Sequence, residues 1–111
     1  MNILREIART LIVPWLPKNG WTPFLPLSVG LSLTNRCNSQ CNMCDYWREP
    51  GEHIPVERAI RLMEAVKRSG VKIINFNARG DIFVHPEIRT ILLAARDMGL
   101  ILSLNTNGLA F

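Results

Sequence analysis

The chain has 111 residues, a formal net charge of +4, 48% hydrophobic residues and 20% charged residues. This balance is typical of a globular protein and excludes a disordered tail, a collagen-like repeat and a strongly basic arm, so nucleic acid is not indicated as a partner. The length sets a further limit. A complete barrel of eight β/α units needs roughly 250 residues, so this chain holds at most part of one.

Residues 1–26 differ in pattern from the rest of the chain. Proline or glycine stands at every third position from Pro14 to Pro26, which interrupts any regular element. We expect an amphipathic helix followed by a proline-spaced arm packed on the main domain, with a helix on a membrane surface as the alternative. Four aliphatic residues at helical spacing define the predicted helix: Ile3, Leu4, Ile7 and Leu11.

The start of the chain does not resemble a secretory signal peptide. Its apolar run, residues 11–16, is short, contains a proline and precedes no small-residue cleavage site. No stretch approaches the ~20 apolar residues of a membrane span. We therefore expect a cytoplasmic protein with no membrane span.

A regular alternation of strands and helices begins at residue 27. Residues 27–33, 71–77 and 100–104 are short apolar runs typical of buried strands. A helical stripe lies between the first two strands: Val56, Ala59, Ile60, Met63 and Val66. A second stripe lies between the second and third strands: Ile88, Ile91, Leu92, Ala95 and Met98.

Each predicted helix has a proline at its start and a glycine at its exit. Pro55 and Gly70 flank the first helix, and Pro86 and Gly99 flank the second. Strands that alternate with helices in this way are parallel and joined by crossovers. We predict the α/β class: a partial TIM-like (β/α) barrel of about three parallel strands and two crossover helices, plus the N-terminal helical arm.

Polar segments follow all three predicted strands, at residues 34–44, 77–81 and 105–108. In parallel α/β folds the carboxyl ends of the strands meet at one edge, where functional groups collect. The strands are predicted from periodicity and the segments from their own residues. Their coincidence is therefore the strongest functional signal in the sequence.

The three cysteines, Cys37, Cys41 and Cys44, have the spacing Cys-x3-Cys-x2-Cys. Such an odd, clustered set suits a reducing compartment and a metal or cluster site better than a secreted disulfide framework. Structural zinc sites and ferredoxin-type clusters take four protein ligands. A four-iron cluster held by three cysteines leaves one iron open for a small molecule, and we favour this interpretation. Zinc with His53 as fourth ligand, or three unliganded cysteines, are the alternatives.

Together these segments resemble the radical S-adenosylmethionine (radical SAM) superfamily. The cysteine spacing after the first strand is similar to the family signature, and Trp47 stands three residues past the last cysteine, as in some members. Residues 76–86 (FNARGDIFVHP) resemble a variant of the family's Gly-Gly-Glu-Pro segment, and residues 104–108 (LNTNG) resemble its Asn-Thr-Asn-Gly strand ending. The resemblance implies that residues 27–111 are the N-terminal half of a radical SAM domain, truncated.

The resemblance implies an enzyme in which the three cysteines ligate a 4Fe-4S cluster. The open iron would bind the amine and carboxylate of S-adenosyl-L-methionine (SAM), and the reduced cluster would cleave the sulfonium. The resulting 5′-deoxyadenosyl radical would abstract hydrogen from an unknown substrate. The implied partners are a flavodoxin- or ferredoxin-like reductant, that substrate and the missing C-terminal half of the barrel.

The resemblance also implies four cofactor-binding residues. Gly80 would lie against the methionine amine, Asp81 belongs to the same loop, and Asn105 and Asn107 would be polar partners for the ribose or the carboxylate. Turn or capping chemistry is the alternative for Asp81 and for both asparagines. Asp81 and Ile82 depart from the family pattern, which usually has Glu and Pro there. The sequence names no catalytic residue.

Two other function classes stay open. One is an iron–sulfur electron-transfer module that never cleaves SAM, and the other is a small zinc-binding interaction domain. The third strand would present an unpaired edge, which a parallel sheet tolerates poorly. We also expect that the 111-residue chain does not turn over substrate alone, because the substrate-binding half of the barrel is missing.

Overall fold

The structure is a computed structural model and describes residues 3, 7, 26–77 and 79–110. Three strands form one sheet in the order β1-β2-β3, and both neighbouring pairs are parallel: β1 is Ser28–Leu31, β2 is Ile73–Phe76 and β3 is Ile101–Leu104. Two helices connect them, α2 (Val56–Arg68) and α3 (Ile88–Asp97). Two single 3-10 turns lie in the loops, η2 (Tyr46–Arg48) and η3 (Ile82–Val84).

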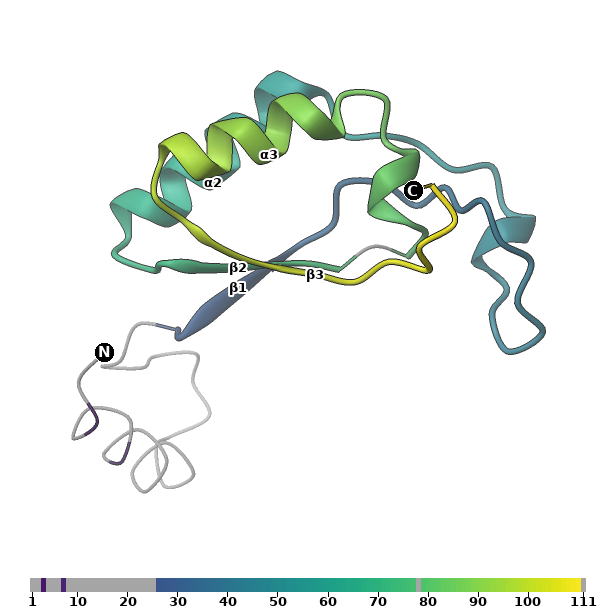
Figure 1. Ribbon diagram of the computed structural model, residues 1–111, viewed down its shortest axis with the longest axis horizontal. Helices are drawn as coiled ribbons and strands as arrows, with labels where there is room; N and C mark the ends of the chain where they lie inside the picture. The colour runs from purple at the N-terminus through teal and green to yellow at the C-terminus, as the bar shows by residue number, and fades with distance from the viewer. Residues whose placement is uncertain (1–2, 4–6, 8–25, 78, 111) are drawn as a thin grey trace, which may run out of the picture.

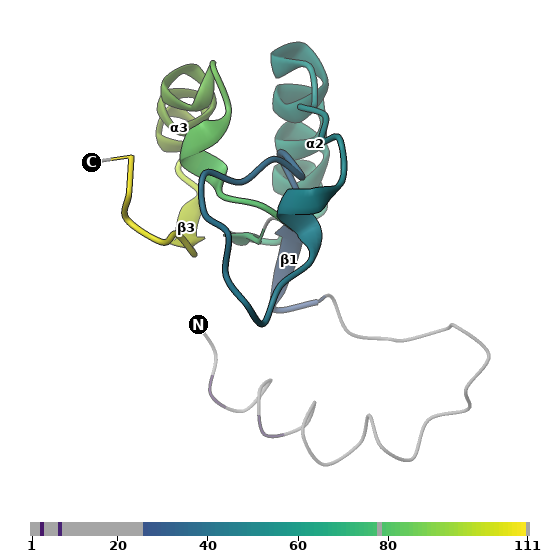
Figure 2. The same cartoon turned by 90° about the vertical axis from the view of Figure 1, so that its right-hand side faces the viewer.

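Both helices cover the same face of the sheet (Figure 1), and they lie side by side in the view of Figure 2. This is the arrangement of a TIM-like barrel segment, in which helices cover the outer face. The predicted α/β class with three parallel strands and two helices is confirmed. The first strand is shorter than the predicted 27–33, because the chain leaves the sheet after Leu31 to pair elsewhere. The second helix begins at Ile88, so Pro86 lies in the turn before it.

The core lies between the sheet and the two helices. Along β2 the side chains alternate, so that Ile74 and Phe76 are fully buried while Asn75 lies on the opposite face. Met63 of α2 and Ile91 of α3 complete this layer from the helical side. Burying each of these side chains contributes about 1.5–3 kcal/mol to the free energy of folding. The contact between the sheet and the two helices is therefore a main source of stability.

Both helices end at a glycine in the left-handed region. Gly70 has φ +89° and Gly99 has φ +72°, a conformation that residues with a Cβ rarely adopt. Their N–H groups donate to the carbonyls of Lys67 (3.0 Å) and Arg96 (2.9 Å). Each helix is thereby closed and the chain redirected into the next strand. The two glycines predicted as helix exits are confirmed.

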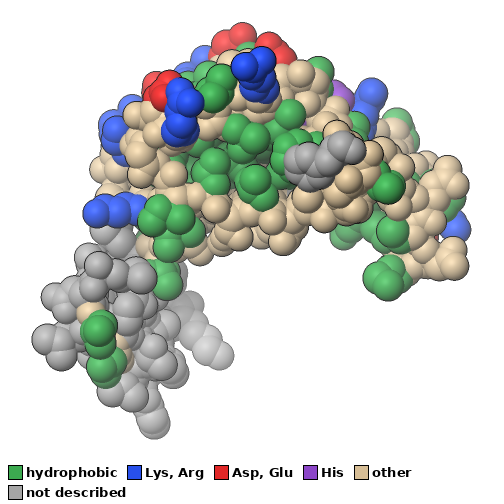
Figure 3. All heavy atoms as spheres, in the orientation of Figure 1, with side chains coloured by type: hydrophobic (Ala, Val, Ile, Leu, Met, Phe, Trp, Pro, Cys, Tyr) green, Lys and Arg blue, Asp and Glu red, His purple; other side chains and the backbone are tan. Residues whose placement is uncertain are grey.

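The β3 side of the sheet keeps an exposed apolar surface. Among the described strands β3 pairs only with β2, so its outer edge is open, as the sequence predicted. Exposed hydrophobic side chains include Leu93 of α3 and Ile101 and Leu104 of β3, and Figure 3 shows hydrophobic side chains gathered over this part of the molecule. A parallel sheet is normally covered at such a surface.

The predicted N-terminal helix and arm, residues 1–26, lie outside the described residues apart from Ile3, Ile7 and Pro26. Ile3 and Ile7 are helical and exposed. Within the part of the chain that the structure describes, no helix is long and apolar enough to cross a membrane.

The core predicts unequal effects for two alanine substitutions on α3. Ile91 is fully buried and Leu93 is 38% exposed. Ile91→Ala should lower the free energy of unfolding by about 2–5 kcal/mol, because it removes buried methyl groups and leaves a cavity. Leu93→Ala should change it by about 0.5 kcal/mol or less. Urea denaturation followed by circular dichroism measures both, and equal losses would contradict this core.

Candidate functional site

The three strands end at the same level of the sheet. Leu31, Phe76 and Leu104 are register partners, so the segments that follow them leave the sheet together. Figure 1 shows the loop after β1 extending beyond the strand ends, beside the segments that follow β2 and β3. The structure therefore brings the three polar segments to one edge, as the sequence predicted.

An antiparallel stem closes the cysteine loop. The Ile54 N–H donates to the Leu33 carbonyl (2.9 Å), and the Asn35 N–H donates to the Glu52 carbonyl (3.2 Å). The Asn35 side chain returns a bond, since its Oδ1 accepts from the Glu52 N–H at 2.7 Å. Residues 37–50, which carry all three cysteines, are thus held at both ends.

Two histidines form hydrogen bonds with residues of this stem. His53 forms a bridge with Thr34, and its Nδ1 lies 2.8 Å from the Thr34 hydroxyl. His85 is buried, its Nε2 lies 2.8 Å from the Ile54 carbonyl oxygen, and its ring centroid is 5.1 Å from that of His53. Burial lowers the pKa of His53, and the charges of His85 and Arg36 lower it further. His53 is therefore neutral at pH 7.

The thiols of the loop are free. Cys37 and Cys44 are half-buried and Cys41 is exposed. The Cys44 N–H donates to the Cys41 carbonyl (3.1 Å), and this turn brings the backbones of the last two cysteines together. Among the described residues no three Cys, His, Asp or Glu side chains form a group that could hold a single metal ion, so His53 is not gathered with the cysteines into a zinc set.

The donor set nevertheless fits a four-iron cluster. In such a cluster each thiolate binds a different iron, so the sulfurs surround a volume and do not converge on one point. The loop supplies three free thiols that, among the described residues, do not converge on a position for a single ion, and hydrogen bonds tie its stem to the strand ends. Cys37, Cys41 and Cys44 are the residues that would hold it.

Asp81 connects the loops after β1, β2 and β3. Its side chain is 2% exposed. Its backbone N–H donates to the Arg36 carbonyl (2.8 Å), which ties the second loop to the first. Oδ1 accepts from the Phe83 N–H at 2.9 Å, and Oδ2 accepts from the Thr106 hydroxyl and the Asn107 N–H, each at 2.7 Å. These last two bonds tie the second loop to the third.

The charge of Asp81 is compensated by these bonds. Burial raises the pKa of Asp81, but the hydrogen bonds from Thr106, Asn107 and Phe83 outweigh burial and bring the pKa below its ordinary value of 3.8. The carboxylate is therefore ionised at neutral pH. The capping alternative for Asp81 has a concrete counterpart here, because the bond from Phe83 caps η3.

Gly80 is packed against the backbone of the first loop. A Cβ at this position would collide with the carbonyl group of Arg36. The loops after β1 and β2 thus approach backbone to backbone, and glycine is required by that approach. The contact of Gly80 with a methionine amine stays a prediction.

Both predicted asparagines make contacts between loops. The Asn105 side chain donates to Asn77 Oδ1 at 2.8 Å. The Asn107 side chain donates to Asn38 Oδ1 at 2.8 Å and reaches Cys37 Sγ at 3.9 Å. The predicted site residues are therefore brought together, while their contacts with a cofactor stay a prediction.

The sequence reasoning missed two contributors to this site. Arg36 supplies the carbonyl that accepts from Asp81, and Thr106 supplies a hydroxyl to the same residue. Thr106 lies inside the Asn-Thr-Asn-Gly segment, so its place in the motif was a signal. The contact of Arg36 left no signal in the sequence. Trp47, which the sequence analysis named, has a buried indole N–H with no hydrogen-bond partner among the described residues.

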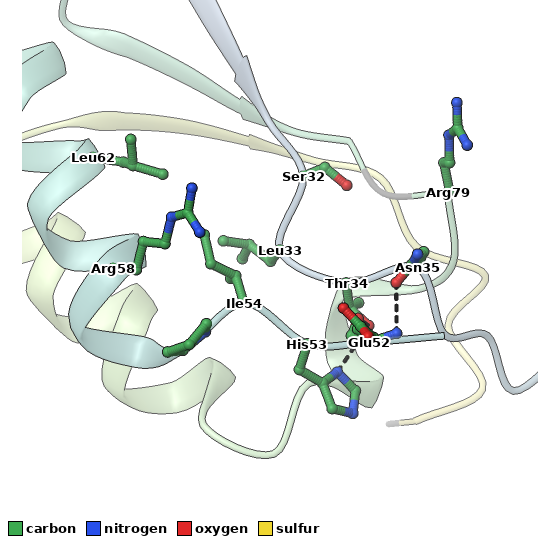
Figure 4. A pocket seen from close by; sticks show the side chains of 11 residues that line it. Ser32, Leu33, Thr34, Asn35, Glu52, His53, Ile54, Arg58, Leu62 and Arg79 are labelled. Atoms are coloured by element: carbon green, nitrogen blue, oxygen red, sulfur yellow. Dashed lines mark hydrogen bonds between the residues drawn. The ribbon is translucent and has the colours of Figure 1, made fainter. Parts of the chain in front are cut away.

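A pocket of about 470 Å³ lies beside this site, between the end of β1 and the start of α2. Arg58 and Arg79 lie on opposite sides of Ser32 in its lining (Figure 4). The described residues that line the pocket include none of the cysteines and not Asp81. It is therefore a separate hollow next to the strand-end loops.

A family model described as the radical SAM superfamily matches residues 31–111. The chain belongs to the radical SAM superfamily. The match begins at the last residue of β1 and spans β2, β3, both helices and the complete cysteine motif. It contains every residue of the strand-end network described above.

Curated relatives agree with this membership. The S-adenosylmethionine-dependent nucleotide dehydratase RSAD2 of Oncorhynchus mykiss is 35% identical over 60 residues, which cover 54% of this chain and 17% of that protein. The tungsten-containing aldehyde ferredoxin oxidoreductase cofactor-modifying protein of Pyrococcus furiosus is 28% identical over 81 residues, covering 70% of this chain and 23% of that protein. The chain thus spans 17 to 23% of the length of these two relatives.

In this radical SAM chain, we expect alanine to lower the stability of the fold at Gly80 but not at Gly30. Gly80→Ala should destabilise the fold by about 1–3 kcal/mol, because the new methyl group meets the Arg36 backbone. Gly30→Ala should not destabilise it, because a Cβ there lies 4.0 Å from its nearest neighbour and alanine favours a strand over glycine. Thermal unfolding compares the two, and equal stability of both variants would disprove the close approach.

The stem histidine predicts a pH dependence of stability. The pKa of folded His53 lies below the ordinary value of 6.5, so the unfolded chain takes up a proton first as the pH falls. The contribution of neutral His53 to the free energy of unfolding is complete above pH 6.5 and is lost progressively below it. His53→Asn, whose side-chain amide can bond the Thr34 hydroxyl but does not titrate, should flatten this dependence. Urea denaturation from pH 7.5 to 5 measures it, and an unchanged slope would contradict this role.

Proposed function

We propose that this chain is the cluster- and cofactor-binding part of a radical SAM enzyme. Cys37, Cys41 and Cys44 would hold a 4Fe-4S cluster with one iron left open for the amine and carboxylate of SAM. When bound, the cluster and SAM supply reductive cleavage of the sulfonium, which yields a 5′-deoxyadenosyl radical that abstracts hydrogen from a substrate. The observation that carries this proposal is a loop with three free thiols whose stem is bonded to the strand ends.

The protein groups in this proposal bind and orient. The stem between residues 33–36 and 51–54 holds both ends of the cysteine loop next to the strand ends. Asp81 keeps the segment after β3 in place through two bonds of 2.7 Å. The side-chain amides of Asn77 and Asn105 lie at the strand ends and offer polar partners to SAM.

The small and polar residues on the helix-free face of the sheet favour a polar substrate. Gly30, Asn75 and Ser103 are register partners across the three strands, on the face that would line the interior of a barrel. The Asn75 side chain donates to the Ser28 hydroxyl on this face at 3.0 Å. Packed barrels fill this layer with bulky branched residues. Small and polar side chains here leave room for a ligand with hydrogen-bonding groups.

The relatives' names do not agree on one substrate. One is named a nucleotide dehydratase and the other a cofactor-modifying protein. Because this chain matches under a quarter of each, neither relative's substrate is carried over, and the SAM chemistry proposed here follows from the family. A flavodoxin- or ferredoxin-like protein would supply the electron to the cluster.

Reconstitution tests the proposal. The chain is loaded anaerobically with iron and sulfide, reduced, and measured by EPR with and without SAM. We expect about four irons per chain, a reduced-cluster signal, and a change of that signal on adding SAM. Cys44→Ser should abolish the signal. The matched control is Met43→Ser, which changes the neighbouring residue of the same loop at a position that is 97% exposed.

Three outcomes would contradict the proposal in different ways. A cluster signal that ignores SAM would favour an electron-transfer module. One tightly bound zinc and no iron would favour a zinc-binding interaction domain. Loss of the signal in Met43→Ser as well as in Cys44→Ser would show that the loop is merely fragile.

A further inference from the structure

The side-chain amide of Asn107 points its NH₂ group at the first cysteine. Its Oδ1 accepts from the Leu109 N–H at 3.0 Å, which fixes the oxygen end of the amide. Its Nδ2 lies 2.8 Å from Asn38 Oδ1 and 3.9 Å from Cys37 Sγ. An amide nitrogen carries two protons, so one bonds Asn38 while the other is available to the sulfur.

The position of Asn107 is fixed by its backbone as well. The Asn107 N–H donates to Asp81 Oδ2 at 2.7 Å, and the neighbouring Thr106 hydroxyl bonds the same oxygen. Gly108 then turns with φ +77°, and its N–H donates to the Thr106 hydroxyl at 3.1 Å. The amide donor is therefore held by its loop and does not depend on Cys37 for its placement.

The acceptor is tied to the same framework. Asp81 donates its backbone N–H to the carbonyl of Arg36, the residue immediately before Cys37. Asp81 thus fixes the segment that carries the donor and the segment that carries the sulfur. A distance of 3.9 Å is long for a neutral thiol, but an ionised sulfur is a stronger acceptor and shortens such bonds.

We propose that Asn107 is a positioning residue that donates a hydrogen bond to the Cys37 thiolate and raises the reduction potential of the cluster. This rests on the proposed function, since it requires a cluster on Cys37. Hydrogen bonds to the sulfurs of an iron–sulfur cluster stabilise its reduced, more negative state, and they are among the factors that set its potential. Asp81 acts through Asn107 in this scheme by holding its backbone.

A redox titration of the reconstituted chain, without SAM, tests this inference. Asn107→Leu removes both amide protons and keeps the number and branching of the side-chain heavy atoms, and its midpoint potential should shift to a more negative value than that of the wild type. Asn107→Gln keeps the amide and should recover part of the shift. Leu109→Ala is the matched control: it shortens a side chain of the same segment that is 64% exposed, and it keeps the Leu109 N–H that donates to Asn107 Oδ1. Its potential should equal that of the wild type.

A second readout observes the bond to the cluster directly. Wild-type chain labelled with nitrogen-15 in asparagine should show nitrogen coupling to the reduced cluster in pulsed EPR. Asn107→Leu should lose one component of it, while Asn38 and Asn42, which follow Cys37 and Cys41, supply the rest in both chains. Equal potentials in all variants, or a coupling pattern that is unchanged in Asn107→Leu, would overturn the inference. A wild type that holds no four-iron cluster would overturn the proposed function, and this inference with it.

Discussion

The strand-end site depends on one buried carboxylate. Asp81 is 2% exposed, yet it carries a charge, and burying a charge without partners is strongly unfavourable. Three hydrogen bonds to its oxygens compensate for that burial, and two of them come from the segment after β3. Its N–H holds the cysteine loop through the carbonyl of Arg36. The relative placement of all three loops therefore follows from satisfying this one group.

The two faces of the sheet carry different kinds of side chain. The face under α2 and α3 holds the buried apolar layer that includes Ile74 and Phe76. The opposite face carries Asn75 and its neighbours Gly30 and Ser103, which bury little apolar surface. Because adjacent residues of a strand point to opposite faces, one short strand contributes to both. The helices stabilise the sheet through one face, so the other face is free to be polar.

The fold was largely predictable because its signals are local. Apolar runs and 3.6-residue periodicity located three strands and two helices, and parallel strands necessarily place their following loops at one edge. The stem was not predictable, since the bond between Thr34 and His53 joins residues 19 positions apart and leaves no periodic trace. For the same reason the sequence named Asp81 but not its partners Thr106 and Arg36. Contacts across loops are decided by the packed fold.

The hydrogen-bond capacity of Asp81 also limits how this end of the sheet could bind a cofactor. A carboxylate offers about four lone-pair sites, and within the described residues three of them accept from Phe83, Thr106 and Asn107. Family members usually have Glu here, and the side chain of Asp81 is one methylene shorter. Its short reach suits bonds within the adjoining loops. Three of the roughly four sites of Asp81 are thus taken up by the loops that it joins, so the carboxylate fixes the shape of this edge and has little capacity left for a ligand.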